Sequence, residues 1–196
     1  MRSLLFISNG RFHPPPAGIK KAKKIINGLD MYRMLHVRKL GRIKDLDLAG
    51  FDCLVLFFHV KENIKNTGCI QKIVEYVNQG GNVLSLHGST ASFKGNKAYT
   101  DMLGSIFLGH DKVEDICIAG FVNYTVRDEL YHHALVQDCE VALEGNGMPI
   151  YWKRRHHGGR VACFIPGHRK EVFDHPETTA ILLDALHFLN RRENGR

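Results

Sequence analysis

Short, mostly apolar runs are the feature that most constrains how this chain folds. "CLVLFF" (Cys53 to Phe58) and "NVLSLH" (Asn82 to His87) place apolar side chains in succession, without regular polar alternation. A strand needs apolar residues on both sides only when both faces of its sheet are covered, as in parallel sheets. We therefore predict that these two runs are adjacent strands inside one sheet.

These runs alternate with stretches whose apolar residues recur at helical spacing. In "CIQKIVEYVNQGG" the apolar positions form one helical face, and the pattern stops at a pair of glycines, as a helix does. Alternation of strands and helices is typical of a sheet covered by helices. We predict strands at 3–8, 32–40, 53–58, 82–87, 115–126, 139–145, 149–154 and 159–168, and helices at 19–29, 69–81, 98–107 and 175–192.

This order of elements fits an α/β fold of the flavodoxin-like type. Such a fold is a three-layer sandwich with a mostly parallel central sheet and helices on both faces. The chain has 196 residues, enough for one domain with a proper core and too few for two. We expect one domain over residues 1–196, with residues 191–196 as a frayed tail.

Composition limits the compartment and the class of protein. No apolar run approaches the roughly 20 residues of a membrane span, and "MRSLLFISNG" fits a first strand better than a secretory leader. The five cysteines are an odd number without CxxC spacing, which argues against a disulfide framework or a zinc knuckle. We expect a cytoplasmic protein with reduced cysteines.

The net charge of +7 has two interpretations. Part of the excess lies in "KKAKK" (Lys20 to Lys24), which is typical of a solvated helix face, although a nucleic-acid patch would look similar. No aromatic residue interleaves these lysines, so we expect no nucleic-acid or membrane partner. An anionic small molecule would also suit the charge. Symmetry favours a homodimer as the oligomer.

Histidines recur where the predicted strands end. His13 follows the first strand, and His59, His87 and His168 each end a later one. Ligands of α/β sheets bind outside the carboxyl ends of the strands, so these imidazoles are candidates for one site. Imidazole is a common metal ligand and a common acid–base group. The alternative is that each histidine caps its own strand and that the side chains never meet.

Two further segments carry polar side chains. "RDELYHH" (Arg127 to His133) places Glu129 and Tyr131 in a predicted loop, and "FLGH" could return His110 to the same sheet edge. "PIYWKRRHHGGRVACF" has the pattern of a β-hairpin that turns at 157–159, with its charges in solvent.

Taken in order, several motifs resemble the trehalose-utilisation family, the ThuA-like domain. They are "GGNVLSLHGSTASF", "YTDMLGSIFLGH", "RDELYH", "PIYWKRRHHGGRVACFIPGH" and the closing amphipathic helix, over roughly 51–189, with 3–14 similar to the family's first strand and loop. The resemblance implies a flavodoxin-like fold, similar to class I glutamine amidotransferases, and a link to sugar metabolism. His87 stands where those amidotransferases carry their nucleophilic cysteine. Glutaminase chemistry is therefore not expected, since imidazole cannot form the glutamyl thioester.

The resemblance also implies a set of site residues. The family's recurrent polar positions match His87, His110, Glu129 and His168, with His13 as a further match. Three imidazoles and a carboxylate suit zinc or another first-row divalent metal. The segment between "GH" and "DELY" is shorter than in the family and lacks its His-Pro pair.

These residues leave three functions open. In a metal-assisted hydrolase or lyase acting on a sugar-derived small molecule, His87, Glu129 and Tyr131 would be catalytic, with Glu129 as a metal ligand or general base. Tyr131 and Arg169 would orient hydroxyls or an anionic group of the substrate, and His13 would contact it from the first loop. The alternatives are a non-catalytic module that binds a metabolite and a structural subunit.

Overall fold

The computed structural model describes residues 1–9, 14–60, 64–136 and 138–191. Its centre is a nine-stranded mixed sheet with the order β2-β1-β3-β4-β11-β10-β9-β6-β7. The parallel half contains β1 (Arg2–Asn9), β2 (Tyr32–Val37), β3 (Cys53–Phe58), β4 (Asn82–Leu86) and β11 (Gly159–Phe164). The antiparallel half contains β6 (Glu114–Gly120), β7 (Tyr124–Asp128), β9 (Glu140–Gly145) and β10 (Met148–His156).

The two apolar runs are adjacent strands, as the sequence predicts. Leu54 of β3 pairs in parallel with Val83 of β4, and every residue of β3 is buried. Burial on both faces removes the side chains of a continuous apolar strand from water, at roughly 1.5–3 kcal/mol for each large residue. These central strands therefore form a rigid base for the residues that follow them.

The antiparallel half departs from a mostly parallel sheet. β10 and β11 form the predicted hairpin, with His157 at a φ of +48° in its turn. Short turns force neighbouring strands to run antiparallel, whereas parallel strands need a long crossover. The segment at 115–126 is likewise two strands, β6 and β7, paired as a hairpin.

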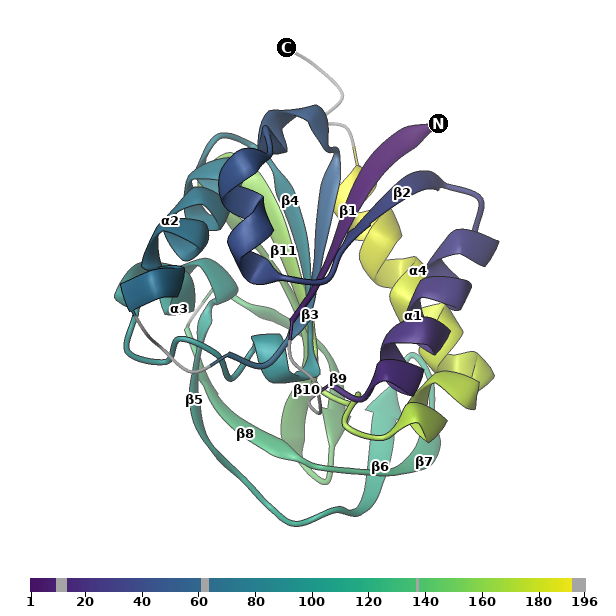
Figure 1. The fold of residues 1–196 in the computed structure, drawn as a ribbon. Coiled ribbons are helices and arrows are strands. Elements are labelled where there is room, and N and C mark those ends of the chain that lie inside the picture. Colours follow the sequence, from purple (N-terminus) through teal and green to yellow (C-terminus); the bar gives the residue numbers. More distant parts are fainter. Residues whose placement is uncertain (10–13, 61–63, 137, 192–196) are drawn as a thin grey trace.

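Four helices pack against the parallel half. In Figure 1, α1 (Pro16–Gly28) and α4 (Pro176–Asn190) lie to one side of the strands, and α2 (Ile64–Asn78) and α3 (Lys97–Leu103) to the other. α1 begins at Pro16, earlier than predicted, because a proline in the first turn loses no helical hydrogen bond. None of the described helices is long and apolar enough to cross a membrane.

The prediction of one helix over 98–107 is wrong. The helix ends at Leu103, its C-cap Gly104 adopts a left-handed φ of +74°, and β5 (Ser105–His110) begins at the next residue. A Cβ at Gly104 would lie 2.5 Å from Arg154 Cδ and from Cys139 Sγ, so both the conformation and the packing favour glycine. The cysteines are all free thiols.

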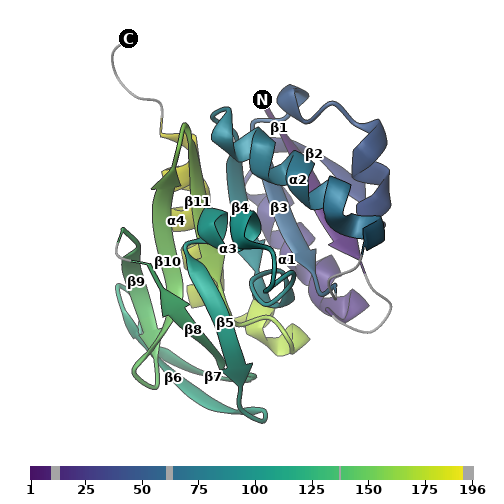
Figure 2. The same cartoon turned by 90° about the vertical axis from the view of Figure 1, so that its left-hand side faces the viewer.

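The motifs "FLGH" and "DELY" are not both loops. β5 pairs with β8 (Tyr131–Leu135) as a separate antiparallel ribbon, with His110 opposite Tyr131. Figure 2 shows this ribbon beside α3 and β10, and residues of these elements are in contact. Alternating burial along β5 explains the strand, since one side of the ribbon faces the protein and the other faces solvent.

Candidate functional site

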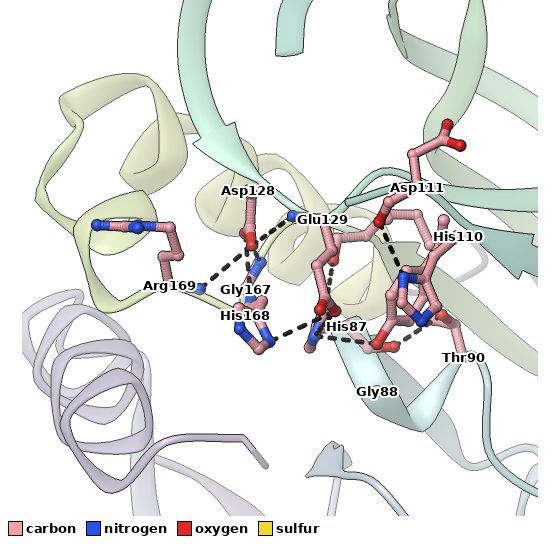
Figure 3. A network of polar contacts seen from close by, with 12 residues as sticks. His87, Gly88, Thr90, His110, Asp111, Asp128, Glu129, Gly167, His168 and Arg169 are labelled. Carbon is pink, nitrogen blue, oxygen red and sulfur yellow. Dashed lines mark hydrogen bonds and ion pairs between the residues drawn. The ribbon is translucent and has the colours of Figure 1, made fainter. Parts of the chain in front are cut away.

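Three predicted site residues meet at the carboxyl end of the parallel strands. His87 follows β4, Glu129 links β7 to β8, and His168 follows β11. Glu129 Oε2 lies 3.8 Å from His87 Nε2 and 3.4 Å from His168 Nδ1. The three side chains converge in Figure 3, so these two histidines do not simply cap separate strands.

His87 occupies a sharp turn between β4 and a short 3₁₀ segment. Its φ is +46°, a conformation that costs a non-glycine residue about 1–3 kcal/mol. The Thr90 hydroxyl donates to the His87 carbonyl at 2.7 Å and holds the turn. Many α/β enzymes present a nucleophile at such a strand-to-helix turn, and this chain presents an imidazole there.

Two glycines make room for this turn. A Cβ at Gly88 would lie 2.8 Å from His59 Cβ and 3.0 Å from the Phe58 carbonyl oxygen. A Cβ at Gly167 would lie 2.9 Å from His87 Cβ. All three distances are shorter than normal van der Waals contacts, so larger residues would displace the imidazole or the strand ends.

The tautomer of His87 follows from its hydrogen bonds. Its side chain is fully buried, and Nδ1 lies 2.9 Å from the Ile165 carbonyl oxygen. A carbonyl only accepts, so Nδ1 carries a proton, and in the neutral ring Nε2 presents a lone pair. Nε2 lies 3.1 Å from the Tyr131 hydroxyl, which also hydrogen-bonds the Glu129 carboxylate. The basic nitrogen of His87 thus faces Glu129 and Tyr131.

Asp128, which is not among the residues predicted from the sequence, connects Glu129 and His168. Its buried carboxylate accepts backbone N–H groups from Glu129 at 2.8 Å, Gly167 at 2.6 Å, His168 at 3.1 Å and Arg169 at 3.2 Å. Burial raises the pKa of Asp128 to about 7, although these N–H groups favour the ionised form. Asp128 therefore fixes the loop of His168 to the end of β7, beside Glu129.

The other predicted residues lie elsewhere. His110 is exposed at the end of β5, where its ring centroid is 5.4 Å from that of Tyr131, outside the group formed by His87, Glu129 and His168. The Arg169 side chain points away from this group in Figure 3 and pairs with Glu171 at 3.5 Å. His13 lies outside the described residues.

A second histidine is buried behind the site. His133 Nε2 lies 3.3 Å from the Thr90 hydroxyl, which already donates to the His87 carbonyl, so Nε2 must carry the proton. Its ring packs 5.2 Å from Trp152. Burial lowers the pKa of His133 to about 3, so the ring is neutral at physiological pH.

The residues His87, Glu129 and His168 fit a metal in donor type and spacing. One ligand atom from each can be chosen so that all lie within 4.8 Å of one another. A tetrahedral ion with bonds of about 2.0–2.1 Å separates its ligands by roughly 3.4 Å, close to the two distances that involve Glu129. The Nδ1–H bond from His87 to a carbonyl is the contact that typically orients a metal-binding imidazole. Two imidazoles and a carboxylate suit zinc and similar ions.

Comparison with known families identifies the family of this chain. The family model for ThuA, described as trehalose utilisation, matches residues 3–189. The chain belongs to the ThuA family. The match extends from β1 to the end of α4 and thus includes all three residues of the His87–Glu129–His168 group. A comparison with curated proteins finds no significant match.

Solved structures share the fold at low sequence identity. A putative ThuA-like protein from Bacteroides uniformis is 13% identical with a TM-score of 0.80, over 100% of this chain and 94% of that one. A cytoplasmic protein from Salmonella typhimurium is 15% identical with a TM-score of 0.70, over 97% and 100% of the two chains. Gan42B, a GH42 β-galactosidase from G. stearothermophilus, is 10% identical with a TM-score of 0.70, over 98% of this chain but only 31% of that one.

Proposed function

We propose that this ThuA-family chain binds a divalent metal through His87, Glu129 and His168 and acts on a sugar-derived small molecule as a hydrolase or lyase. The observation that carries this proposal is the convergence of the three side chains, since Glu129 Oε2 lies 3.8 Å from His87 Nε2 and 3.4 Å from His168 Nδ1. When bound, such a metal would polarise a carbonyl group or activate water.

The chain's own residues have separable roles in this proposal. His87 is fixed by the Ile165 carbonyl and supplies a ligand that cannot rotate away. Glu129 lies between both imidazoles and is largely buried, with 16% of its side chain exposed, so it can act as a ligand or receive a proton. Tyr131 has a hydroxyl at the same point and can hydrogen-bond a substrate oxygen.

A carbohydrate substrate has support from outside the geometry. The family description is trehalose utilisation, and one structure with this fold is a β-galactosidase. The site itself is polar and faces solvent on one side, since 34% of the His168 side chain is exposed. A polyhydroxylated molecule suits such a site because its hydroxyls can bond to imidazole, carboxylate and phenol groups.

Zinc titration calorimetry tests the metal site directly. The metal-free protein should bind one zinc ion per chain, and His87→Asn, Glu129→Gln and His168→Asn should each weaken binding at least tenfold. His187→Asn, at an exposed position on α4, is the matched control and should leave the affinity unchanged. Equal affinities in all four variants would refute the metal site.

His110→Asn separates two ligand sets. If the exposed His110 remains outside the site, this variant should bind zinc as the wild type does. A loss as large as that of His168→Asn would instead support the four-residue set predicted from the sequence. Hydrolysis or elimination of sugar derivatives by the zinc-loaded protein, lost in Glu129→Gln, distinguishes an enzyme from a module that only binds them.

A further inference from the structure

A basic cleft lies between α1 and the edge strand β2, which are neighbours in Figure 1. Its volume is about 710 Å³. The described residues that line it include four permanent cations and no acidic residue: Ser8, Pro16, Ile19, Lys20, Lys23, Lys24, Asn27, His36 and Arg38. Unbalanced positive charge around a concave surface concentrates anions there.

A buried hydroxyl in this cleft has a proton to donate. Lys23 Nζ lies 3.0 Å from His36 Nδ1, and an ammonium only donates, so Nδ1 accepts. His36 Nε2 must then carry the proton that it donates to the Ser8 hydroxyl oxygen at 2.9 Å. This leaves the Ser8 hydroxyl hydrogen to donate to another group, although Ser8 is only 4% exposed.

The neutral state of His36 supports this assignment. Burial, together with Lys23 and Arg38, lowers the pKa of His36 to about 4. The neutral imidazole accepts a hydrogen bond from Lys23 at Nδ1 and donates one to Ser8 from Nε2, and it adds no charge to the cleft. The cleft therefore combines lysine ammonium groups at its rim with a hydroxyl donor at its base.

The cleft also has a wall for a carbon skeleton. Pro16 and Ile19 line it, and the alkyl part of Lys20 adds apolar surface. Ser8 pairs across the sheet with Phe57 of β3, and the next strand, β4, ends just before His87. Two strand spacings are about 10 Å, so the backbone of Ser8 lies about this far from the end of β4.

We propose that this cleft binds the phosphate group of a small phosphate monoester. Several lysines suit a dianion with three exposed oxygens, and lysine is a common phosphate ligand. The Ser8 hydroxyl donates to one of these oxygens. This site is distinct from the metal site and does not depend on it, so it can be tested in metal-free protein.

Calorimetry in metal-free, low-salt buffer tests this site with glucose 6-phosphate, inorganic phosphate and glucose as probes. The wild type should bind glucose 6-phosphate at least as tightly as inorganic phosphate, and should not bind glucose. The double variant K20Q/K23Q should bind glucose 6-phosphate at least tenfold more weakly than the wild type. The charge-matched control K21Q/K97Q alters lysines that pair with Asp174 and Asp101 outside the cleft, and should change binding less than twofold.

Ser8→Ala tests the hydroxyl and should weaken phosphate binding three- to tenfold. Equal losses in the two double variants would show that only net charge matters and would overturn the proposal. Binding of inorganic phosphate without glucose 6-phosphate would overturn it too. So would binding of a single-stranded 12-nucleotide DNA when neither small phosphate binds, because the patch would then recognise nucleic acid.

Discussion

Asp128→Asn tests whether one carboxylate holds the site together. Each oxygen of Asp128 accepts two backbone N–H groups, Oδ1 from Glu129 and Arg169 and Oδ2 from Gly167 and His168. Asparagine keeps one acceptor oxygen and turns an NH₂ group toward the other two donors. Since a buried donor left unpaired costs roughly 1–3 kcal/mol, this variant should lose about 2–4 kcal/mol of unfolding free energy.

The same substitution should change how stability depends on pH. Burial raises the pKa of Asp128 from 3.8 to about 7, so the folded protein binds this proton more tightly than the unfolded chain. The contribution of protonated Asp128 to the free energy of unfolding is therefore complete below pH 4 and is lost as the pH rises through 7. The loss between pH 5 and pH 8 is about 3 kcal/mol. Asp128→Asn removes this decrease.

Urea unfolding at pH 5 and pH 8, followed by the fluorescence of Trp152, measures both effects. Asp111→Asn is the control, because Asp111 is 52% exposed and should contribute less than about 1 kcal/mol. An Asp128→Asn protein that loses less than about 1 kcal/mol at pH 8, where the wild-type carboxylate is ionised, would refute the role of the four N–H donors. A pH slope equal to that of the wild type would refute the raised pKa.

Three further changes have defined outcomes. Burial lowers the pKa of His133 to about 3, so the neutral ring's contribution to the free energy of unfolding is complete above pH 6.5 and is lost on acidification. His133→Gln should therefore remove about 2 kcal/mol of the decrease in unfolding free energy between pH 8 and pH 5, measured by urea titration. Gly88→Ala brings a Cβ within 2.8 Å of His59 Cβ and should cost about 1–3 kcal/mol by the same assay. Tyr131→Phe removes the hydroxyl that competes for His87 Nε2 and should raise zinc affinity severalfold by calorimetry; weaker binding would mean that the hydroxyl supports the metal.

The sequence predicts the parallel half of the fold well, because its signals are local. Apolar runs identify β3 and β4, and the histidine that follows β4 reaches the predicted edge. The ribbon of β5 and β8 is harder to predict, since neither strand is a continuous apolar run and the ribbon packs against α3 and β10. Gly104, a glycine inside an apolar segment, is the residue that indicates that the helix predicted at 98–107 ends early.

Site residues can be predicted from the sequence only where the side chain itself is a recognisable metal ligand or acid–base group. His87, Glu129 and His168 stand out as ligand types, and the structure brings them together. Asp128 precedes Glu129 in "RDEL" and was missed, because its role depends on backbone N–H groups about 40 residues away. No sequence pattern records such a contact.

The contacts of Asp128 also determine when the site can form during folding. They join the end of β7 to the loop after β11, and β7 is an edge strand of the sheet. Contacts between such distant segments form late, because the entropy of closing the intervening loop opposes them. Exchange of the Gly167 and His168 amide hydrogens should therefore require disruption of this long-range contact rather than fraying of a single strand. Slowing of that exchange by zinc would show that the metal stabilises the fully assembled chain.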